Sequence, residues 1–154
     1  MKIYLMRHGD AESPATDPQC PLSPTGKMDI ERVAANLSRY PLDITHIFHS
    51  EKLRAQQTAH IVATHLTLNG LMDVHSNMNP NDSVIPLADE INHSDTDLLF
   101  VGHMPFMGKL VSHLIMQNDQ NEVILFRTGT IVCLERISHS TSWLIQWVIN
   151  PDLC

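Results

Sequence analysis

Short apolar runs alternate with amphipathic segments along most of the chain. Runs of four or five apolar or β-branched residues are typical of strands, and apolar residues recurring every three or four positions are typical of helices. The predicted strands cover 3–6, 44–48, 73–76 and 98–101. The predicted helices cover 24–37, 53–66, 87–91 and 105–116, with stop signals before Pro41 and at Asn69-Gly70.

Two further strands are predicted at 130–137 and 143–149, separated by a polar turn at 138–142. Such a short connection predicts an antiparallel hairpin. Alternate residues of the last strand (Trp143, Ile145, Trp147 and Ile149) are large and apolar, so we expect them to share one face and pack in the core.

The order of these elements predicts an α/β fold. Strands that alternate with helices form parallel sheets covered on both faces, and the continuous apolar run at 98–101 is typical of a strand buried on both sides. We therefore predict a three-layer sandwich with a mostly parallel central sheet and a C-terminal antiparallel hairpin. No linker or repeat divides the chain, so 1–154 is expected to be a single domain.

The composition and net charge limit the kinds of molecule that the protein can bind. Seventeen acidic residues against ten Lys and Arg give a net charge of −7, the wrong sign for general nucleic-acid binding, so an anionic ligand would need a local positive site. No run is long enough for a membrane span or a signal peptide, and three unrelated cysteines form no disulfide framework. We expect a cytoplasmic protein without membrane association, and the charge and short chain are compatible with a monomer.

Ten histidines invite the hypothesis of a metal-binding protein. Their spacing does not favour it: no HExxH is present, and His46 and His49 would face opposite sides of one strand. We expect no metal, and a structural or solvated role for His46, His60, His65, His75, His93, His113 and His139.

Cationic and basic side chains follow three of the predicted strands. Arg7-His8-Gly9 follows the first, Ser50 and then Arg54 follow the second, and Gly102-His103 follows the strand at 98–101. Parallel strands end at the same sheet edge, where ligands bind in α/β folds. Two guanidiniums match phosphate oxygens, and imidazoles can act as nucleophiles, so this edge is predicted to bind a phosphoryl group.

Four sequence blocks in order resemble the landmarks of one family. They are Arg7-His8-Gly9, the segment 21–26 (PLSPTG), Ser50 with 53–58 (LRAQQT), and Val101-Gly102-His103. They are similar to the motifs of the histidine phosphatase superfamily, also called phosphoglycerate mutase-like. Small size, the absence of an inserted lid, and Met104-Pro105 after His103 resemble its SixA-type branch of phosphohistidine phosphatases.

The resemblance implies a role for each matching residue. His8 would be the nucleophile, with a pKa depressed by its charged neighbours, while Arg7, Arg54 and His103 would bind the phosphoryl oxygens without a metal or other cofactor. Gly9, Ser50 and Thr58 would line the substrate site; for Ser50, Thr58 and also Thr128, helix or loop hydrogen bonding is an equal alternative. The implied partner is a phosphohistidine-containing phosphotransfer domain or phosphocarrier protein.

The general acid is the open question. Phosphate esters need an acid to protonate the leaving alkoxide, and only Asp82, Asp10 and Glu12 are candidates. A phosphoramidate needs less help, which favours phosphohistidine as substrate. The alternatives are a small-molecule phosphomonoesterase or mutase of the same superfamily, a His-rich metal-binding protein, and a phosphoprotein-binding module without turnover.

Overall fold

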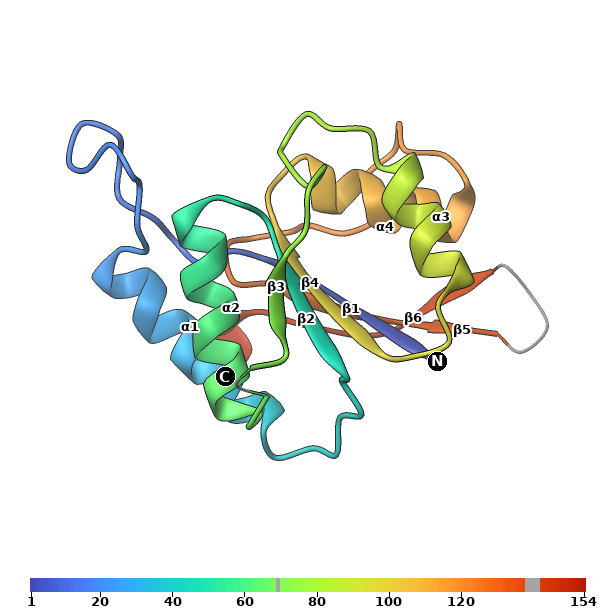
Figure 1. Cartoon of the computed structure of the whole chain (residues 1–154), viewed down its shortest axis with the longest axis horizontal. Coiled ribbons are helices and arrows are strands. Elements are labelled where there is room, and N and C mark those ends of the chain that lie inside the picture. The colour runs from blue at the N-terminus through green and yellow to red at the C-terminus, as the bar shows by residue number, and fades with distance from the viewer. Residues whose placement is uncertain (69, 138–141) are drawn as a thin grey trace.

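The computed structural model describes residues 1–68, 70–137 and 142–154 (Figure 1). The strands are β1 (Lys2–Arg7), β2 (His46–His49), β3 (Met72–Val74), β4 (Leu98–Gly102), β5 (Ile131–Arg136) and β6 (Trp143–Ile149). The helices are α1 (Pro24–Leu37), α2 (Leu53–His65), α3 (Ile85–His93) and α4 (Phe106–Met116), with a short 3-10 helix, η1 (Pro151–Leu153). Every predicted element is present, with ends shifted by up to two residues.

The six strands form one mixed sheet in the order β3-β2-β4-β1-β5-β6. The first four strands of this order are mutually parallel, whereas β5 runs antiparallel to both β1 and β6. Helices α1 and α2 cover one face and α3 and α4 the other (Figure 1). This arrangement confirms the predicted α/β sandwich with a mostly parallel sheet and a C-terminal hairpin.

The period of two along β1 divides the core between the two faces of the sheet. Ile3 and Leu5 pack toward α3 and α4, while Tyr4 and Met6 pack toward α1 and α2. All five residues of β4 are buried, as the continuous apolar run predicted. β1 and β4 are thus the buried centre of the sheet, and because they are parallel their carboxyl ends lie at the same edge.

The prediction that β6 places its large apolar residues on one face is wrong. The pairing with β5 shifts register between Cys133 and Leu134, so Gln146 is an extra residue in β6. Trp143 is buried toward α3 and α4, Ile145 is 41% exposed, and Trp147 packs toward α1 and α2, together with Ile149. Of the predicted polar turn, residues 138–141, including His139, lie outside the described residues, as does Asn69 of the predicted α2 stop.

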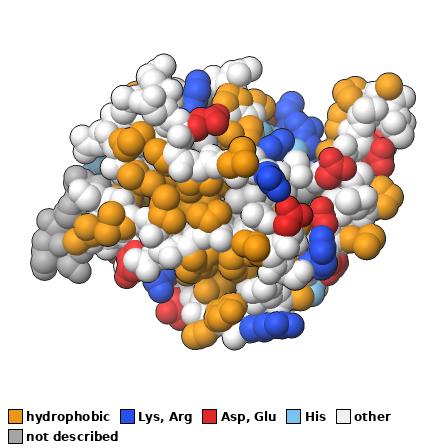
Figure 2. Space-filling model, turned by 180° about the vertical axis from the view of Figure 1, so that it is seen from behind, with side chains coloured by type: hydrophobic (Ala, Val, Ile, Leu, Met, Phe, Trp, Pro, Cys, Tyr) orange, Lys and Arg blue, Asp and Glu red, His pale blue; other side chains and the backbone are white. Residues whose placement is uncertain are grey.

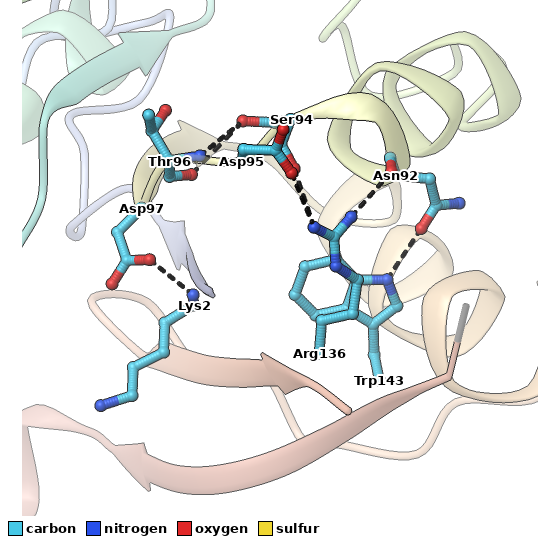
Figure 3. Close-up of polar contacts among 8 residues, drawn as sticks. All are labelled: Lys2, Asn92, Ser94, Asp95, Thr96, Asp97, Arg136 and Trp143. Atoms are coloured by element: carbon cyan, nitrogen blue, oxygen red, sulfur yellow. Dashed lines mark hydrogen bonds and ion pairs between the residues drawn. The ribbon is translucent and has the colours of Figure 1, made fainter. Parts of the chain in front are cut away.

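A polar cluster ties the hairpin to the turn between α3 and β4 (Figure 3). Arg136 donates to the carbonyl oxygens of Asn92 and Ser94 at 2.8 and 3.1 Å and pairs with the Asp95 carboxylate at 3.3 Å. Its guanidinium lies 5.8 Å from the ring centroid of Trp143, whose Nε1 donates to the Asn92 side chain at 2.9 Å. The cluster lies where β5 ends and β4 begins, at the opposite end of the sheet from the predicted site.

Candidate active site

The carboxyl ends of β1, β2 and β4 lie side by side, as predicted. Arg7 at the end of β1 pairs with Gly102 at the end of β4, and β4 pairs with β2 on its other side. His8, Ser50 and His103 each follow one of these strand ends directly. The fold therefore brings the three predicted segments to one edge of the sheet.

The ring of His8 is held by a hydrogen bond at each nitrogen. Nδ1 lies 2.6 Å from the carbonyl oxygen of Gly9, and Nε of Arg54 donates to Nε2 at 3.2 Å. Because a guanidinium only donates, Nε2 accepts, and the proton of the neutral ring sits on Nδ1 and is donated to Gly9. The lone pair of Nε2 is thus directed toward the Arg54 guanidinium.

The main chain around His8 is bonded on both sides. The His8 amide donates to the carbonyl oxygen of Gly102 at 3.0 Å, and its carbonyl oxygen accepts from the Gly129 amide at 3.0 Å. Gly129 has a φ of 74°, and a Cβ there would lie 2.9 Å from Cγ of Pro151, so only glycine fits. The sequence analysis missed this segment apart from the half-buried Thr128; the sole signal was a glycine directly before a predicted strand.

Thr58 connects α2 to the segment that follows β1. Its hydroxyl donates to the carbonyl oxygen of Arg54 at 2.8 Å and accepts from the Gly9 amide at 3.1 Å, and the side chain is fully buried. A Cβ at Gly9 would lie 2.8 Å from Cγ1 of Ile30, so glycine allows this segment to pack against α1. Thr58 and Gly9 therefore hold the His8 segment against α1 and α2; their contact with substrate stays a prediction.

Arg7 keeps part of its guanidinium unpaired. Nη1 donates to the carbonyl oxygen of Phe126 at 2.8 Å, while Nε is buried without a partner in the described part of the chain. Burial lowers the pKa of Arg7, and the nearby Asp10 carboxylate acts in the opposite direction. A buried N–H without a partner is an unmet donor, which an anionic oxygen would satisfy.

His103 lies beside His8, with 4.9 Å between the ring centroids. It is 1% exposed, and its Nε2 lies 2.7 Å from the hydroxyl oxygen of Ser50. Among residues 1–68, 70–137 and 142–154, no group bonds to its buried Nδ1. Like Arg7, His103 thus presents an unpartnered nitrogen within the site.

Both site histidines are neutral at neutral pH. Burial lowers the pKa of His8 to about 4; the positive charges of Arg54 and Arg7 act in the same direction, and the Gly9 carbonyl opposes them. Burial also lowers the pKa of His103 to about 3, assisted by His8 and Arg54. The predicted depression of the His8 pKa has burial as its main cause, with neighbouring charge second.

Two of the three candidate acids accept hydrogen bonds from loop or helix-cap groups. The Asp10 carboxylate accepts from the Ser23 hydroxyl at 2.6 Å, and the same hydroxyl caps the start of α1 at the Gly26 amide. The Asp82 carboxylate accepts from the Asn79 amide at 2.7 Å. Glu12 is half-buried in the projecting segment between β1 and α1 (Figure 1).

The outer surface carries charges of both signs near the projecting lobe (Figure 2). Seen from behind, Lys and Arg side chains lie at the base of the projecting lobe, with histidine among them (Figure 2).

Several histidines outside the site pair with surface carboxylates, such as His46 with Asp73 and His75 with Glu90, both at 2.9 Å. Within the described ranges, no three His, Cys, Asp or Glu side chains gather as metal ligands, and no helix could span a membrane.

Comparison with known proteins identifies relatives of the chain. A family model described as the histidine phosphatase superfamily (branch 1) matches residues 3–76. The chain is 32% identical to phosphohistidine phosphatase SixA of Escherichia coli (strain K12), over 98% of this chain and 94% of that protein.

Solved structures agree in fold. The protein histidine phosphatase SixA complexed with tungstate matches with a TM-score of 0.86 and 25% identity, over 99% of this chain and 98% of that one. A phosphoserine phosphatase from Entamoeba histolytica in complex with 3-phosphoglyceric acid matches with a TM-score of 0.73 and 15% identity, over 96% and 95% of the two chains. At that identity, the second likeness concerns the fold alone.

Proposed function

The chain belongs to the histidine phosphatase superfamily, and on that premise we propose that it hydrolyses the N–P bond of phosphohistidine carried on another protein. The observation that carries the proposal is the environment of His8. Its neutral ring directs a lone pair from Nε2 toward a guanidinium, beside nitrogens of Arg7 and His103 that have no partner among the described residues. A nucleophile surrounded by donors for anionic oxygens suits phosphoryl transfer.

In the first step, Nε2 of His8 attacks phosphorus on the side opposite the leaving group. A bond forms between Nε2 and phosphorus while the bond to the substrate imidazole breaks, and the leaving nitrogen takes up a proton. Arg7, Arg54 and His103 stabilise the charge on the three remaining oxygens. The Nδ1–H donated to Gly9 keeps the proton away from the attacking nitrogen.

In the second step, water attacks the phosphorus of phospho-His8. The oxygen–phosphorus bond forms, the bond to Nε2 breaks, and inorganic phosphate leaves as His8 regains its neutral form. The Gly102 and Gly129 contacts hold the His8 main chain through both steps. The same oxygens are bound throughout, so the groups that bind them need no rearrangement.

The engaged carboxylates support phosphohistidine over phosphate esters. An alkoxide leaving group requires a positioned acid, whereas a phosphoramidate nitrogen can be protonated by solvent. Asp10 and Asp82 are bonded within loops and a cap. The proposed substrate is therefore a phosphotransfer domain or phosphocarrier protein whose phosphohistidine is presented to this edge of the sheet.

The decisive experiment uses a phosphohistidine-carrying protein as substrate. We predict that His8→Ala abolishes release of phosphate, and that brief acid-free quenching of the wild-type protein traps an acid-labile phosphate on His8. Arg54→Ala is expected to retain folding and to lose about 10²- to 10³-fold in kcat, as expected when one donor to the transition state is removed.

The same assay distinguishes the alternatives. Efficient turnover of 3-phosphoglycerate or sugar phosphates, with slow turnover of phosphohistidine, would contradict the proposed substrate. A binding module would protect the phosphoprotein without forming phospho-His8. Activity is expected to survive treatment with EDTA, because the arginines supply the positive charge; loss of activity restored by a divalent cation would favour the metal hypothesis.

A further inference from the structure

One buried contact in the site links Ser50 with His103. Ser50 follows β2, His103 follows β4, and each is 1% exposed. The Ser50 hydroxyl oxygen lies 2.7 Å from Nε2 of His103. An imidazole has two nitrogens, so this contact leaves Nδ1 as the nitrogen that can bind a ligand.

The Ser50 hydroxyl oxygen has a second contact, with the main chain after β2. The main-chain N–H of Lys52 donates to the same oxygen at 3.4 Å. In the described part of the chain, Nε2 of His103 is then the acceptor within reach of the hydroxyl proton. Donation from Ser50 to Nε2 gives the buried hydroxyl proton an acceptor, and a neutral His103 ring then carries its own proton on Nδ1.

The Nδ1 atom of His103 is buried within the site and has no hydrogen-bond partner among the described residues. Its ring lies 4.9 Å from the His8 ring, and the low pKa of His103, about 3, keeps the ring neutral with a single N–H. A buried N–H beside the attacking ring can be satisfied by an anionic oxygen held there.

We propose that Ser50 is a positioning residue that fixes His103 in its Nδ1–H tautomer and so aims an N–H at an oxygen of the phosphoryl group on its way to His8. The resemblance left open whether Ser50 lines the substrate site or makes structural hydrogen bonds, and the proposal rests on its contact with His103. The identity of the ligand rests on the proposed function, but the tautomer of His103 in the free protein does not.

The tautomer can be read directly by NMR of protein labelled with ¹⁵N at histidine, at neutral pH. We expect the wild-type spectrum to show His103 protonated at Nδ1 and unprotonated at Nε2. In Ser50→Ala, Nε2 loses its donor, so we expect a shift toward the Nε2–H form, and Ser50→Thr should restore the wild-type pattern. A wild-type His103 protonated at Nε2 would overturn the proposal without any variant.

Phosphate binding and phosphatase activity are measured in the wild type, Ser50→Ala and Ser50→Thr. Ser50→Ala is expected to weaken binding of inorganic phosphate and to lower kcat/KM for a phosphohistidine protein by about tenfold each, the value of one hydrogen bond, with recovery in Ser50→Thr. Ser112→Ala is the control, because Ser112 is also fully buried but bonds only within α4, to the carbonyl oxygen of Gly108 at 3.0 Å.

The outcomes separate the two proposals. Unchanged phosphate affinity in Ser50→Ala, or an equal loss in Ser112→Ala, would show that the Ser50 hydroxyl does not act through His103. A protein that has the expected tautomer and phosphate response but does not cleave phosphohistidine would refute the proposed function while supporting the role of Ser50.

Discussion

The reactivity of His8 depends on which ring nitrogen is left free and on whether the ring is protonated. Gly9 takes the proton of Nδ1, and burial keeps the second proton away by lowering the pKa to about 4. Histidine in an unfolded chain has a pKa of about 6.5, so acid protonates the unfolded state first. The burial that keeps His8 neutral therefore also makes the free energy of unfolding depend on pH.

We predict that the free energy of unfolding falls as pH drops from about 6.5 toward 4. His8 and His103 have lowered pKa values in the folded state, so their neutral forms favour folding above pH 6.5, and that contribution is lost on acidification. Each ring should remove about 2 kcal/mol between pH 7 and pH 5. Urea titrations across this range measure the slope, and His8→Asn with His103→Asn should flatten it. A wild-type slope near zero would contradict the prediction.

At the residue level, the sequence predicted which side chains meet but not how they bond. Arg7, His8, Arg54 and His103 were recognisable because each lies at or just after a strand or at the start of a helix. The contact between Ser50 and His103 joins residues 53 positions apart, and the carbonyl of Phe126 that binds Arg7 carries no sequence signal at all. Such contacts depend on side-chain rotamers and loop paths that no local pattern encodes.

Among the elements, the C-terminal hairpin shows both the success and the limit of periodicity. Alternating residues predicted β5 and β6 and their antiparallel pairing. The extra residue at Gln146 reverses the face of Trp147 relative to Trp143, and one inserted residue in a strand of uncharged, mostly apolar side chains leaves no signal in the pattern. Beyond the extra residue, Arg136 pairs with Trp143 across the hairpin, and both contact the α3–β4 region.

We predict that Arg136→Ala destabilises the protein by about 1–2 kcal/mol, because it removes two bonds to main-chain carbonyls and the cover over Trp143. Arg127→Ala is the matched control. Arg127 pairs with Asp152 at 2.9 Å, but both side chains are more than half exposed, so its loss should cost less than about 0.5 kcal/mol. Equal effects of the two substitutions, measured by chemical denaturation, would contradict the role of this cluster.

For the whole molecule, the site joins the two layers of helices through the sheet edge. Arg54 lies on α2 over one face, and the residues that follow β1 and β4 connect it to the other. A bound oxyanion would neutralise the mutual repulsion of Arg7 and Arg54 and satisfy the unpartnered donors. Ligand binding should therefore stabilise the fold as well as occupy the site.

We predict that inorganic phosphate at 100 times its Kd raises the free energy of unfolding by about 2.7 kcal/mol, through binding to the folded state alone. Thermal denaturation at fixed pH measures this rise, with chloride at equal ionic strength as the control. Arg54→Ala should lose most of the effect. If phosphate raised the free energy of unfolding of Arg54→Ala by the same amount, the anion would bind outside this site.

The Gly129 amide that bonds to the His8 carbonyl lies in the turn just before β5, the strand that runs antiparallel to β1 and β6. β5 pairs with β1 on the side not covered by β4, and the turn that leads into β5 holds the main chain of His8. A substitution in the turn before β5 is therefore expected to shift the position of His8 without changing any charged residue of the site.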